Sequence, residues 1–170
     1  HTLGLIGLGR LGSNVAKVGA AFGMKVIAWS QNLTEERAAA GGATLVSKEE
    51  LFRQSDVISV HYILSPRSRG MIAAEDIALM KPDALFINTS RGPIVDEAAL
   101  IDALENRRIG GAGLDTFNEE PLPLDHPFRR LDNVLVTPHI GYVTVDNYRI
   151  FYGDALEDVL AFLDGAPIRV

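Results

Sequence analysis

The chain has 170 residues, 47% of them hydrophobic, and a formal net charge of −6. This length and composition predict one globular domain with a core of its own, not a disordered chain. The acidic balance argues against nucleic acid and anionic membranes as partners. The absence of cysteine excludes disulfides and thiolate metal sites. Because there is no membrane-length apolar run and no signal-peptide pattern, we expect a soluble, cytoplasmic protein without a metal centre.

The chain opens with a strand, a glycine-rich turn and a helix. Residues 3–6 form a short apolar run, as in a buried parallel strand. The turn Gly7-Leu8-Gly9-Arg10-Leu11-Gly12 follows, and residues 13–22 have helical periodicity. We expect the helix to pack on a sheet through its large apolar residues, which are Leu11, Val15, Val18 and Phe22. This order of elements is the context in which a GxGxxG motif binds a dinucleotide.

Each glycine of the turn has a physical role in such a site. Gly7 permits the tight turn, Gly9 lets a pyrophosphate approach the backbone, and Gly12 lets helix and strand pack closely. Backbone N–H groups at the start of the helix, around Arg10 and Leu11, then hold the phosphates. The alternative is a turn that needs its glycines for packing alone.

The rest of the chain alternates between strand and helix patterns. Further strands are predicted at residues 25–29, 43–46, 56–60, 84–88, 110–115 and 133–137. Helices are predicted after the cap Thr34, after a capping box at residues 47–50, and at residues 76–80, 97–106 and 144–164. This alternation predicts an α/β fold with a doubly wound, mostly parallel sheet of the Rossmann type.

Several predicted strands end in chemically useful residues. These are Ser30, His61, Thr89 to Arg91, Asp115 and His139. Ligands bind beyond the carboxyl ends of the strands in such sheets. A purely structural domain does not need an arginine and two histidines there, so we expect a binding or catalytic site at this edge.

Ser30 leaves the choice between NAD and NADP open. The dinucleotide fingerprint normally has an Asp or Glu at the end of the second strand, which accepts from the ribose 2′-hydroxyl. A serine neither repels a 2′-phosphate nor selects it. Arg37 lies further along and is equally well explained as a solvated helix residue.

Four motifs together resemble the cofactor domain of the D-isomer-specific 2-hydroxyacid dehydrogenases. They are residues 7–12, residues 88–96 (NTSRGPIVD), Leu114-Asp115 with residues 119–123 (EEPLP), and residues 137–141 (TPHIG). Their order and spacing match the family, and the resemblance covers essentially the whole chain. It implies that residues 1–170 form a dinucleotide-binding domain and act on a small 2-oxo or 2-hydroxy acid.

The resemblance also implies three catalytic residues. Arg91 binds the substrate carboxylate, for which a planar guanidinium is suited. His139 is the general acid and base, because its pKa lies near working pH. Glu120 orients His139, and the following Pro121 favours it over Glu119. The alternatives are a surface arginine, a structural histidine and a solvated loop carboxylate.

Further residues are assigned by the same resemblance to the cofactor. Asp115 accepts from the nicotinamide carboxamide, unless it is only a turn residue. Tyr62, Ile63 and Ser68 match loop positions near the ribose and nicotinamide, although Ile63 stands where the family often has proline. Thr89, Ser90 and Gly141 belong to the same set. His61 and His126 are read as structural residues of their loops.

Family members are about twice this long, and their active site lies between two domains. We therefore expect the chain to be the cofactor domain of a longer enzyme. We expect the substrate-binding domain to be absent from this chain, apart from any contribution of the C-terminal segment. The sequence does not distinguish among glyoxylate, hydroxypyruvate and phosphoglycerate as the type of substrate. The alternative function is an NAD(H)-sensing module resembling related corepressors, and in either case the resemblance implies a homodimer.

Overall fold

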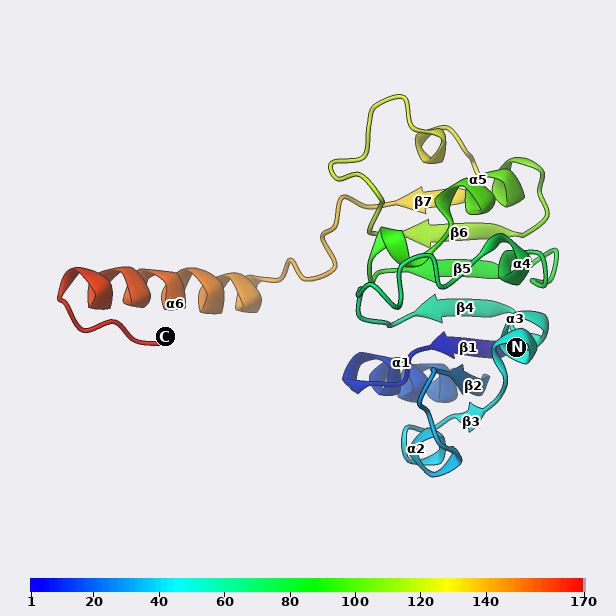
Figure 1. Ribbon diagram of the computed structural model, residues 1–170, viewed down its shortest axis with the longest axis horizontal. Coiled ribbons are helices and arrows are strands. Elements are labelled where there is room, and N and C mark those ends of the chain that lie inside the picture. The colour runs from blue at the N-terminus through cyan, green and yellow to red at the C-terminus, as the bar shows by residue number, and fades with distance from the viewer. Residues whose placement is uncertain (170) are drawn as a thin grey trace. The chain divides into compact units, whose positions relative to one another are not determined.

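The computed structural model describes residues 1–169 and divides into two compact units. The first unit is His1–Pro138, and the second begins at His139. The first unit contains every strand of the described chain, and the second contains one long helix (Figure 1).

The first unit is built on a seven-stranded sheet in the order β3-β2-β1-β4-β5-β6-β7. All neighbouring strands are parallel. The strands are β1 (Thr2–Ile6), β2 (Lys25–Trp29), β3 (Thr44–Leu45), β4 (Val57–Val60), β5 (Leu85–Asn88), β6 (Gly111–Leu114) and β7 (Val134–Val136). Their carboxyl ends share one edge of the sheet (Figure 1). The predicted doubly wound parallel sheet is confirmed.

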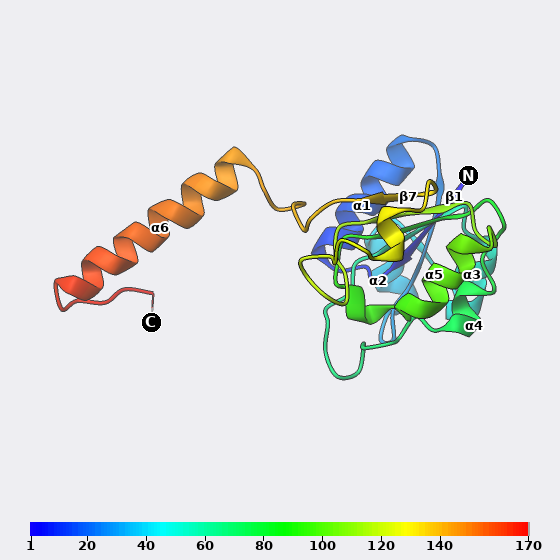
Figure 2. The ribbon, with the colours of Figure 1, turned by 90° about the horizontal axis from the view of Figure 1, so that it is seen from above.

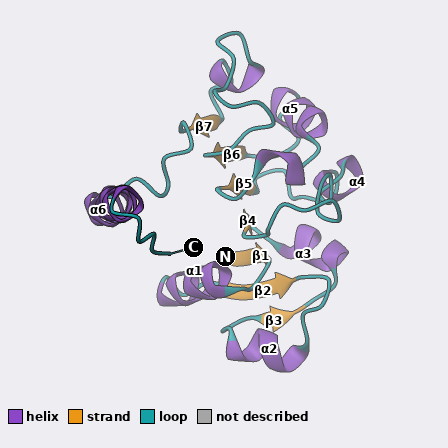
Figure 3. Cartoon of the chain, turned by 60° about the vertical axis from the view of Figure 1, so that its left-hand side comes forward, coloured by secondary structure: helices purple, strands orange, loops and turns teal. Residues whose placement is uncertain are grey.

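Helices cover both faces of this sheet. They are α1 (Arg10–Ala21), α2 (Glu35–Ala40), α3 (Lys48–Gln54), α4 (Ala74–Ile77) and α5 (Glu97–Glu105), with short 3-10 turns at Gly92–Ile94 and Pro127–Arg129. Helices α3, α4 and α5 lie on one face and α1 lies on the other (Figures 2 and 3). The predicted caps Thr34 and Ser47 are present, and Asp96 caps α5: each side chain accepts a backbone N–H from the first turn.

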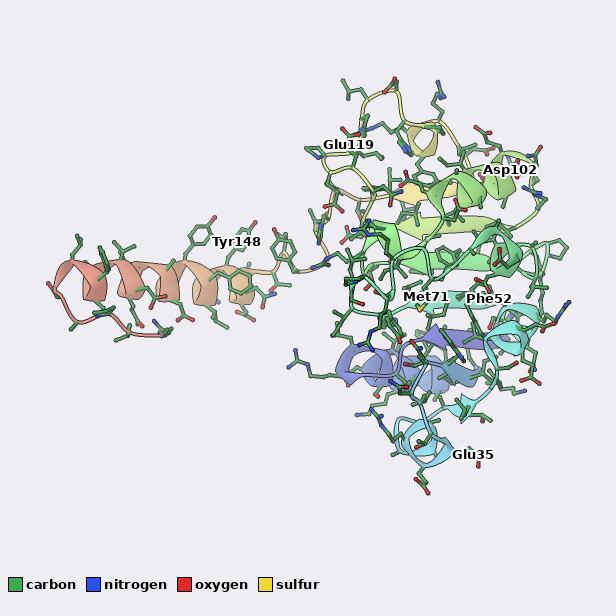
Figure 4. All side chains as sticks on the ribbon, in the orientation of Figure 1. Glu35, Phe52, Met71, Asp102, Glu119 and Tyr148 are labelled. Carbon is green, nitrogen blue, oxygen red and sulfur yellow. The ribbon has the colours of Figure 1, made fainter. Side chains whose placement is uncertain are left out.

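The strands divide their side chains between two hydrophobic clusters. Leu51 and Phe52 of α3 are fully buried in the larger cluster, as predicted, together with Ile6 of β1. Figure 4 shows the position of Phe52 beside the sheet. Leu3 and Leu5 alternate with Ile6 and belong to the smaller cluster under α1. This alternation is the period-two pattern of a strand buried on both faces.

The predicted packing face of α1 is wrong for three of its four residues, and only Val15 packs, half-buried, against the smaller cluster. Leu11, Val18 and Phe22 are 65%, 56% and 81% exposed. The helix instead buries its small residues Gly12, Ala16 and Gly19. A Cβ on Gly19 would lie 2.5 Å from the Leu3 side chain, so the helix axis is too close to the sheet for larger residues. The row of small residues along one side of the helix, and not the periodicity of its large apolar residues, therefore determines which face packs on the sheet.

One half of the α1 face of the sheet carries exposed apolar side chains. Leu3 pairs with Val57, and Val57 pairs with Leu85, so their side chains point to the same face. Ile87 pairs with Gly113, and Gly113 with Leu135, which places Leu135 on this face too. Leu85 is 44% and Leu135 is 71% exposed. We call the surface around these two residues the open half-sheet.

The second unit is dominated by α6 (Val145–Leu163). Thr144 caps it by accepting the N–H of Asn147, near the predicted start. Arg169 pairs with Asp154, Glu157 and Asp158 of the helix, and these bonds raise the pKa of its guanidinium. None of the residues of α6 is buried. Figure 4 shows one of its exposed side chains, Tyr148. The predicted apolar residues, which are Tyr148, Phe151, Tyr152, Leu156, Val159, Leu160 and Leu163, are all exposed.

We expect Gly12→Ala to destabilise the chain. A Cβ at residue 12 would lie 2.2 Å from the carbonyl oxygen of Gly7, and a backbone atom cannot rotate away. Overpacking of this kind costs about 1–3 kcal/mol. Urea unfolding should show a net decrease of this size in the free energy of unfolding, even though alanine favours the helical conformation more than glycine does. Phe22→Ser is the control and should change the free energy of unfolding by less than about 0.5 kcal/mol. Equal losses in the two variants would contradict this account of α1.

Candidate functional site

A groove runs along the carboxyl edge of the sheet in the first unit. It consists of two hollows of about 330 and 310 Å³ that share His61, Tyr62 and Ile63. The first hollow is also lined by Gly7, Leu8, Gly9, Ser30, Asn32, Leu33 and Arg37. The second is also lined by Leu11, Leu64, Thr89, Ser90 and Arg91. Each volume lies in the range of small-molecule sites, and together they suit an elongated ligand.

The glycine turn has the geometry that a phosphate needs. Gly7 has a φ of 94°, and a Cβ there would lie 2.3 Å from the carbonyl oxygen of His61. At Gly9, by contrast, no atom lies within 4 Å of the place of a Cβ. Gly9 is also the N-cap of α1 and offers no side chain to the helix. Within residues 1–169, the backbone N–H groups of Arg10, Leu11 and Gly12 consequently donate to no acceptor. The turn therefore fits an anion at the helix N-terminus.

The middle of the groove is held by His61. Its Nε2 lies 2.9 Å from the hydroxyl of the buried Ser59. Burial lowers the pKa of the His61 imidazole below its ordinary value, because the charged form loses solvation. A histidine that stays neutral adds no positive charge here at neutral pH, so His61 lines the groove as a hydrogen-bonding and packing residue.

The loop after β4 is fixed by its own side chains. Ser68 is 1% exposed, and its hydroxyl donates to the carbonyl of Ile63 while accepting the N–H of Ser65. Ser68 therefore stabilises the loop conformation through hydrogen bonds, and it does not line either hollow. Tyr62 and Ile63 do line both hollows. Tyr62 is tied to the next loop, because Ser90 Oγ donates to its carbonyl oxygen at 2.5 Å.

Arg91 sits on a turn held by a buried asparagine. Asn88 is 2% exposed; its Oδ1 accepts the N–H of Ser90, and its Nδ2 donates to the carbonyl of Arg91. Gly92 then packs on the next loop, where a Cβ would lie 2.1 Å from the carbonyl carbon of Phe117. The Arg91 side chain is exposed and lines the second hollow. The sequence analysis gave Asn88 no role, although its position inside the NTSRGP motif was a signal.

Glu120 lies on the loop that Gly92 contacts. Its Oε1 accepts the N–H of Phe117 at 3.0 Å, and the Glu120–Pro121 peptide is cis. The same loop is tied to α5, since Oε2 of Glu97 accepts the N–H of Asn118 at 3.2 Å. Glu119 is labelled on this loop in Figure 4.

The other histidine of this loop has structural contacts. Nδ1 of His126 accepts the N–H of Phe128, and its Nε2 lies 3.5 Å from Oε1 of Glu97. Its ring also packs on Phe128, with 4.9 Å between ring centroids. These contacts agree with the reading of His126 as a loop residue and add Glu97, which the sequence analysis missed, as its partner.

The remaining predicted site residues are distributed between the two units. Asp115 is buried at the end of β6 and accepts from the Thr137 hydroxyl at 2.5 Å. His139 and Gly141 belong to the second unit. His139 has a left-handed backbone, with a φ of 54°, and its ring is 6.1 Å from that of Tyr142 in an edge-on arrangement. The roles of Asp115, Glu120, His139 and Gly141 stay predictions.

Residues 1–169 contain neither a candidate metal site nor a candidate membrane span. No group of three or more His, Asp or Glu side chains is placed to hold a metal ion. No helix in the same range combines the length and hydropathy of a membrane span.

Comparison with known proteins gives consistent matches. Residues 1–141 match the family model described as "D-isomer specific 2-hydroxyacid dehydrogenase, NAD binding domain". D-3-phosphoglycerate dehydrogenase of Synechocystis sp. is 44% identical over 99% of this chain and 30% of its own length. Glyoxylate reductase of Aeropyrum pernix is 41% identical over 96% of this chain and 49% of its own.

The solved structures agree. Phosphoglycerate oxidoreductase from Vibrio cholerae O395 superposes with a TM-score of 0.90 and is 37% identical over 97% of this chain and 53% of its own. The chain thus spans about half or less of the length of these relatives.

We expect His61 to make stability depend on pH. Its pKa is about 6.5 in the unfolded chain and lower in the native state, so the unfolded state takes up the proton first. The contribution is complete above pH about 6.5 and is lost as pH falls through the native pKa. His61→Gln should flatten the change in the free energy of unfolding between about pH 7.5 and pH 5, measured with urea. Asp56, whose pKa is lowered from 3.8 by Lys81 and Thr2, titrates below this window. An unchanged slope in the variant would contradict the assignment.

Proposed function

The chain belongs to the D-isomer specific 2-hydroxyacid dehydrogenases as their NAD-binding domain, and on that premise we propose that it is the cofactor half of a dehydrogenase for 2-hydroxy and 2-oxo acids. One observation carries the proposal. A groove that begins at an open glycine turn continues past His61 into a hollow lined by Arg91. A dinucleotide site and a carboxylate-binding cation are thereby joined on one edge of the sheet.

The residues present fit a nicotinamide dinucleotide. The open space at Gly9 and the unbonded N–H groups of Arg10 and Leu11 suit the pyrophosphate. The first hollow then receives the adenosine half and the second the nicotinamide half, with Tyr62 and Ile63 between them. When bound, the cofactor donates or accepts the hydride at its nicotinamide ring. Asp115 is assigned to the nicotinamide carboxamide, and Thr89, Ser90 and Gly141 are assigned to the cofactor.

Arg91 binds and orients the acid substrate. Its guanidinium offers a fork of donors to the substrate carboxylate, and the carbonyl at C2 is then held toward the nicotinamide half of the groove. The turn formed by Asn88 supports this role, because it fixes the backbone from which the exposed side chain extends. A preorganised cation lowers the entropy cost of bringing the substrate into position.

His139 moves the proton. In reduction it donates a proton to the C2 carbonyl oxygen, and in oxidation it accepts the proton of the C2 hydroxyl. Glu120 orients its ring and favours the protonated form. The bond from the Phe117 N–H holds one oxygen of Glu120 and supports this role.

The substrate class is a small 2-oxo or 2-hydroxy acid of the D series. The relatives described above are named for glyoxylate and for phosphoglycerate, and hydroxypyruvate is the third candidate. Since this chain spans only 30–53% of the length of these relatives, we infer that most of the pocket that distinguishes these acids lies outside the 170 residues. Cytoplasmic localisation, and the absence of nucleic-acid and membrane partners, stay predictions.

We expect two substitutions to remove activity in the two-domain protein that contains this chain. Reduction of glyoxylate and hydroxypyruvate is followed through the consumption of NADH. Arg91→Gln should lower kcat/KM by about 100-fold or more, and His139→Gln by about 10²–10⁴-fold. The control Arg130→Gln changes an exposed arginine outside the groove and should be neutral.

The outcomes separate the enzyme from its alternative. The 170-residue chain alone should bind NADH and turn over poorly. If the longer protein binds NADH and reduces no 2-oxo acid, the chain is instead a nucleotide-sensing module of the corepressor kind.

We also propose that the chain forms a homodimer through the open half-sheet. Leu85 and Leu135 expose apolar surface that a second copy can cover. We expect sedimentation velocity to detect a dimer of the purified chain, and Leu135→Asp to weaken association by about tenfold or more. Leu124→Asp is the matched control, because Leu124 is 90% exposed in a loop. A monomeric chain, or equal behaviour of both variants, would refute this surface.

A further inference from the structure

The far end of the first hollow has no negative charge in its lining. Ser30 directly follows the last residue of β2, where the dinucleotide fingerprint has an Asp or Glu. The other lining residues contributed by this part of the chain are Asn32, Leu33 and Arg37. A carboxylate at Ser30 would repel a 2′-phosphate on the adenosine ribose, and the serine does not.

Arg37 supplies a positive charge at the same end. Nη1 of Arg37 donates to the carbonyl oxygen of Asn32 at 3.4 Å, so the side chain folds back over the turn from Ser30 to Leu33. Within residues 1–169, Arg37 makes no ion pair with a carboxylate, so its charge is not neutralised by a salt bridge. The sequence alone left open whether Arg37 is more than a solvated helix residue, and the structure places it in the lining of the groove.

The backbone around Arg37 is fixed. Leu33 N–H donates to the carbonyl of Ser30 at 3.0 Å, which closes the turn. Thr34 Oγ1 accepts the N–H of Arg37 at 3.3 Å, which caps α2. These two bonds tie the residue that bears the guanidinium to the residue that ends β2. Within residues 1–169, the guanidinium makes no hydrogen bond besides the one to Asn32.

Two glutamates lie near this arginine and do not line the hollow. Glu35 and Glu36 occupy the first turn of α2 and are both exposed. Figure 4 shows Glu35 at the outer edge of the first unit. Arg37 is exposed as well, but it lines the first hollow, whereas Glu35 and Glu36 do not.

We propose that this groove accepts a 2′-phosphorylated dinucleotide, with Arg37 as the partner of the 2′-phosphate and Ser30 as a neutral hydrogen-bonding neighbour. The inference rests on the proposed function and deepens it: NADPH binds to the chain at least as tightly as NADH. Guanidinium and phosphate form charge-assisted, bidentate hydrogen bonds, which account for this preference.

The test is a pair of fluorescence titrations of the 170-residue chain, with NADH and with NADPH at one salt concentration. We expect the Kd for NADPH to equal or fall below that for NADH. Arg37→Gln should weaken NADPH by about 10- to 100-fold, because it removes a charged hydrogen-bonding partner, and leave NADH within about twofold. Ser30→Asp should weaken NADPH by a similar factor through repulsion and leave NADH binding intact.

Two further variants separate this inference from the proposed function. Arg130→Gln changes an exposed arginine outside the groove and should affect neither nucleotide. Gly9→Ala places a methyl group where the pyrophosphate is expected and should weaken both nucleotides equally. If the unmodified chain binds neither nucleotide, the proposed function itself fails. If NADH binds more tightly than NADPH, or if Arg37→Gln weakens both alike, the 2′-phosphate site is refuted.

Discussion

The close approach of α1 to β1 is the constraint on which the rest of the structure depends. The helix begins so near the strand that residue 12 has no room for a Cβ against the Gly7 carbonyl, and residue 19 has none against Leu3. This distance brings the unbonded N–H groups of the first helical turn to the carboxyl edge of the sheet. It also turns the large side chains of α1 outward. The phosphate site and the apolar exterior of α1 thus have one physical cause.

Buried and half-buried polar side chains fix the loops at the carboxyl edge of the sheet. Asn88 holds the turn of Arg91, Ser68 closes the loop of Tyr62 and Ile63, and Ser90 joins these two loops. Glu97 ties the Glu120 loop to α5. The candidate side chains Arg91 and Glu120 are therefore exposed, while the backbone that bears them is fixed. Such an arrangement places a cation and a carboxylate accurately without burying an unpaired charge.

The two faces of the sheet in the first unit are covered unequally. One face of the sheet is covered by α3, α4 and α5, whereas the other has α1 over one half and exposed leucines over the remainder. Apolar surface of this kind gains free energy when another protein surface covers it. A second copy that covers the open half-sheet would leave the carboxyl edge of the sheet accessible to cofactor and substrate.

The sequence by itself determined the parallel sheet, the helix caps, the order of the elements and the family, because these follow from local periodicity and short motifs. It also predicted that Ser30, His61 and Arg91 share one edge, since parallel strands share their carboxyl ends, and the family resemblance added Tyr62 and Ile63. Only the tertiary structure decided which face of α1 packs, because the contact distance between helix and sheet, and not apolar periodicity, selects small residues. It alone brought Arg37 into the groove and gave Asn88 and Glu97 their roles. The partners in those contacts depend on how the turns fold in three dimensions. The spacing of residues along the chain does not encode this.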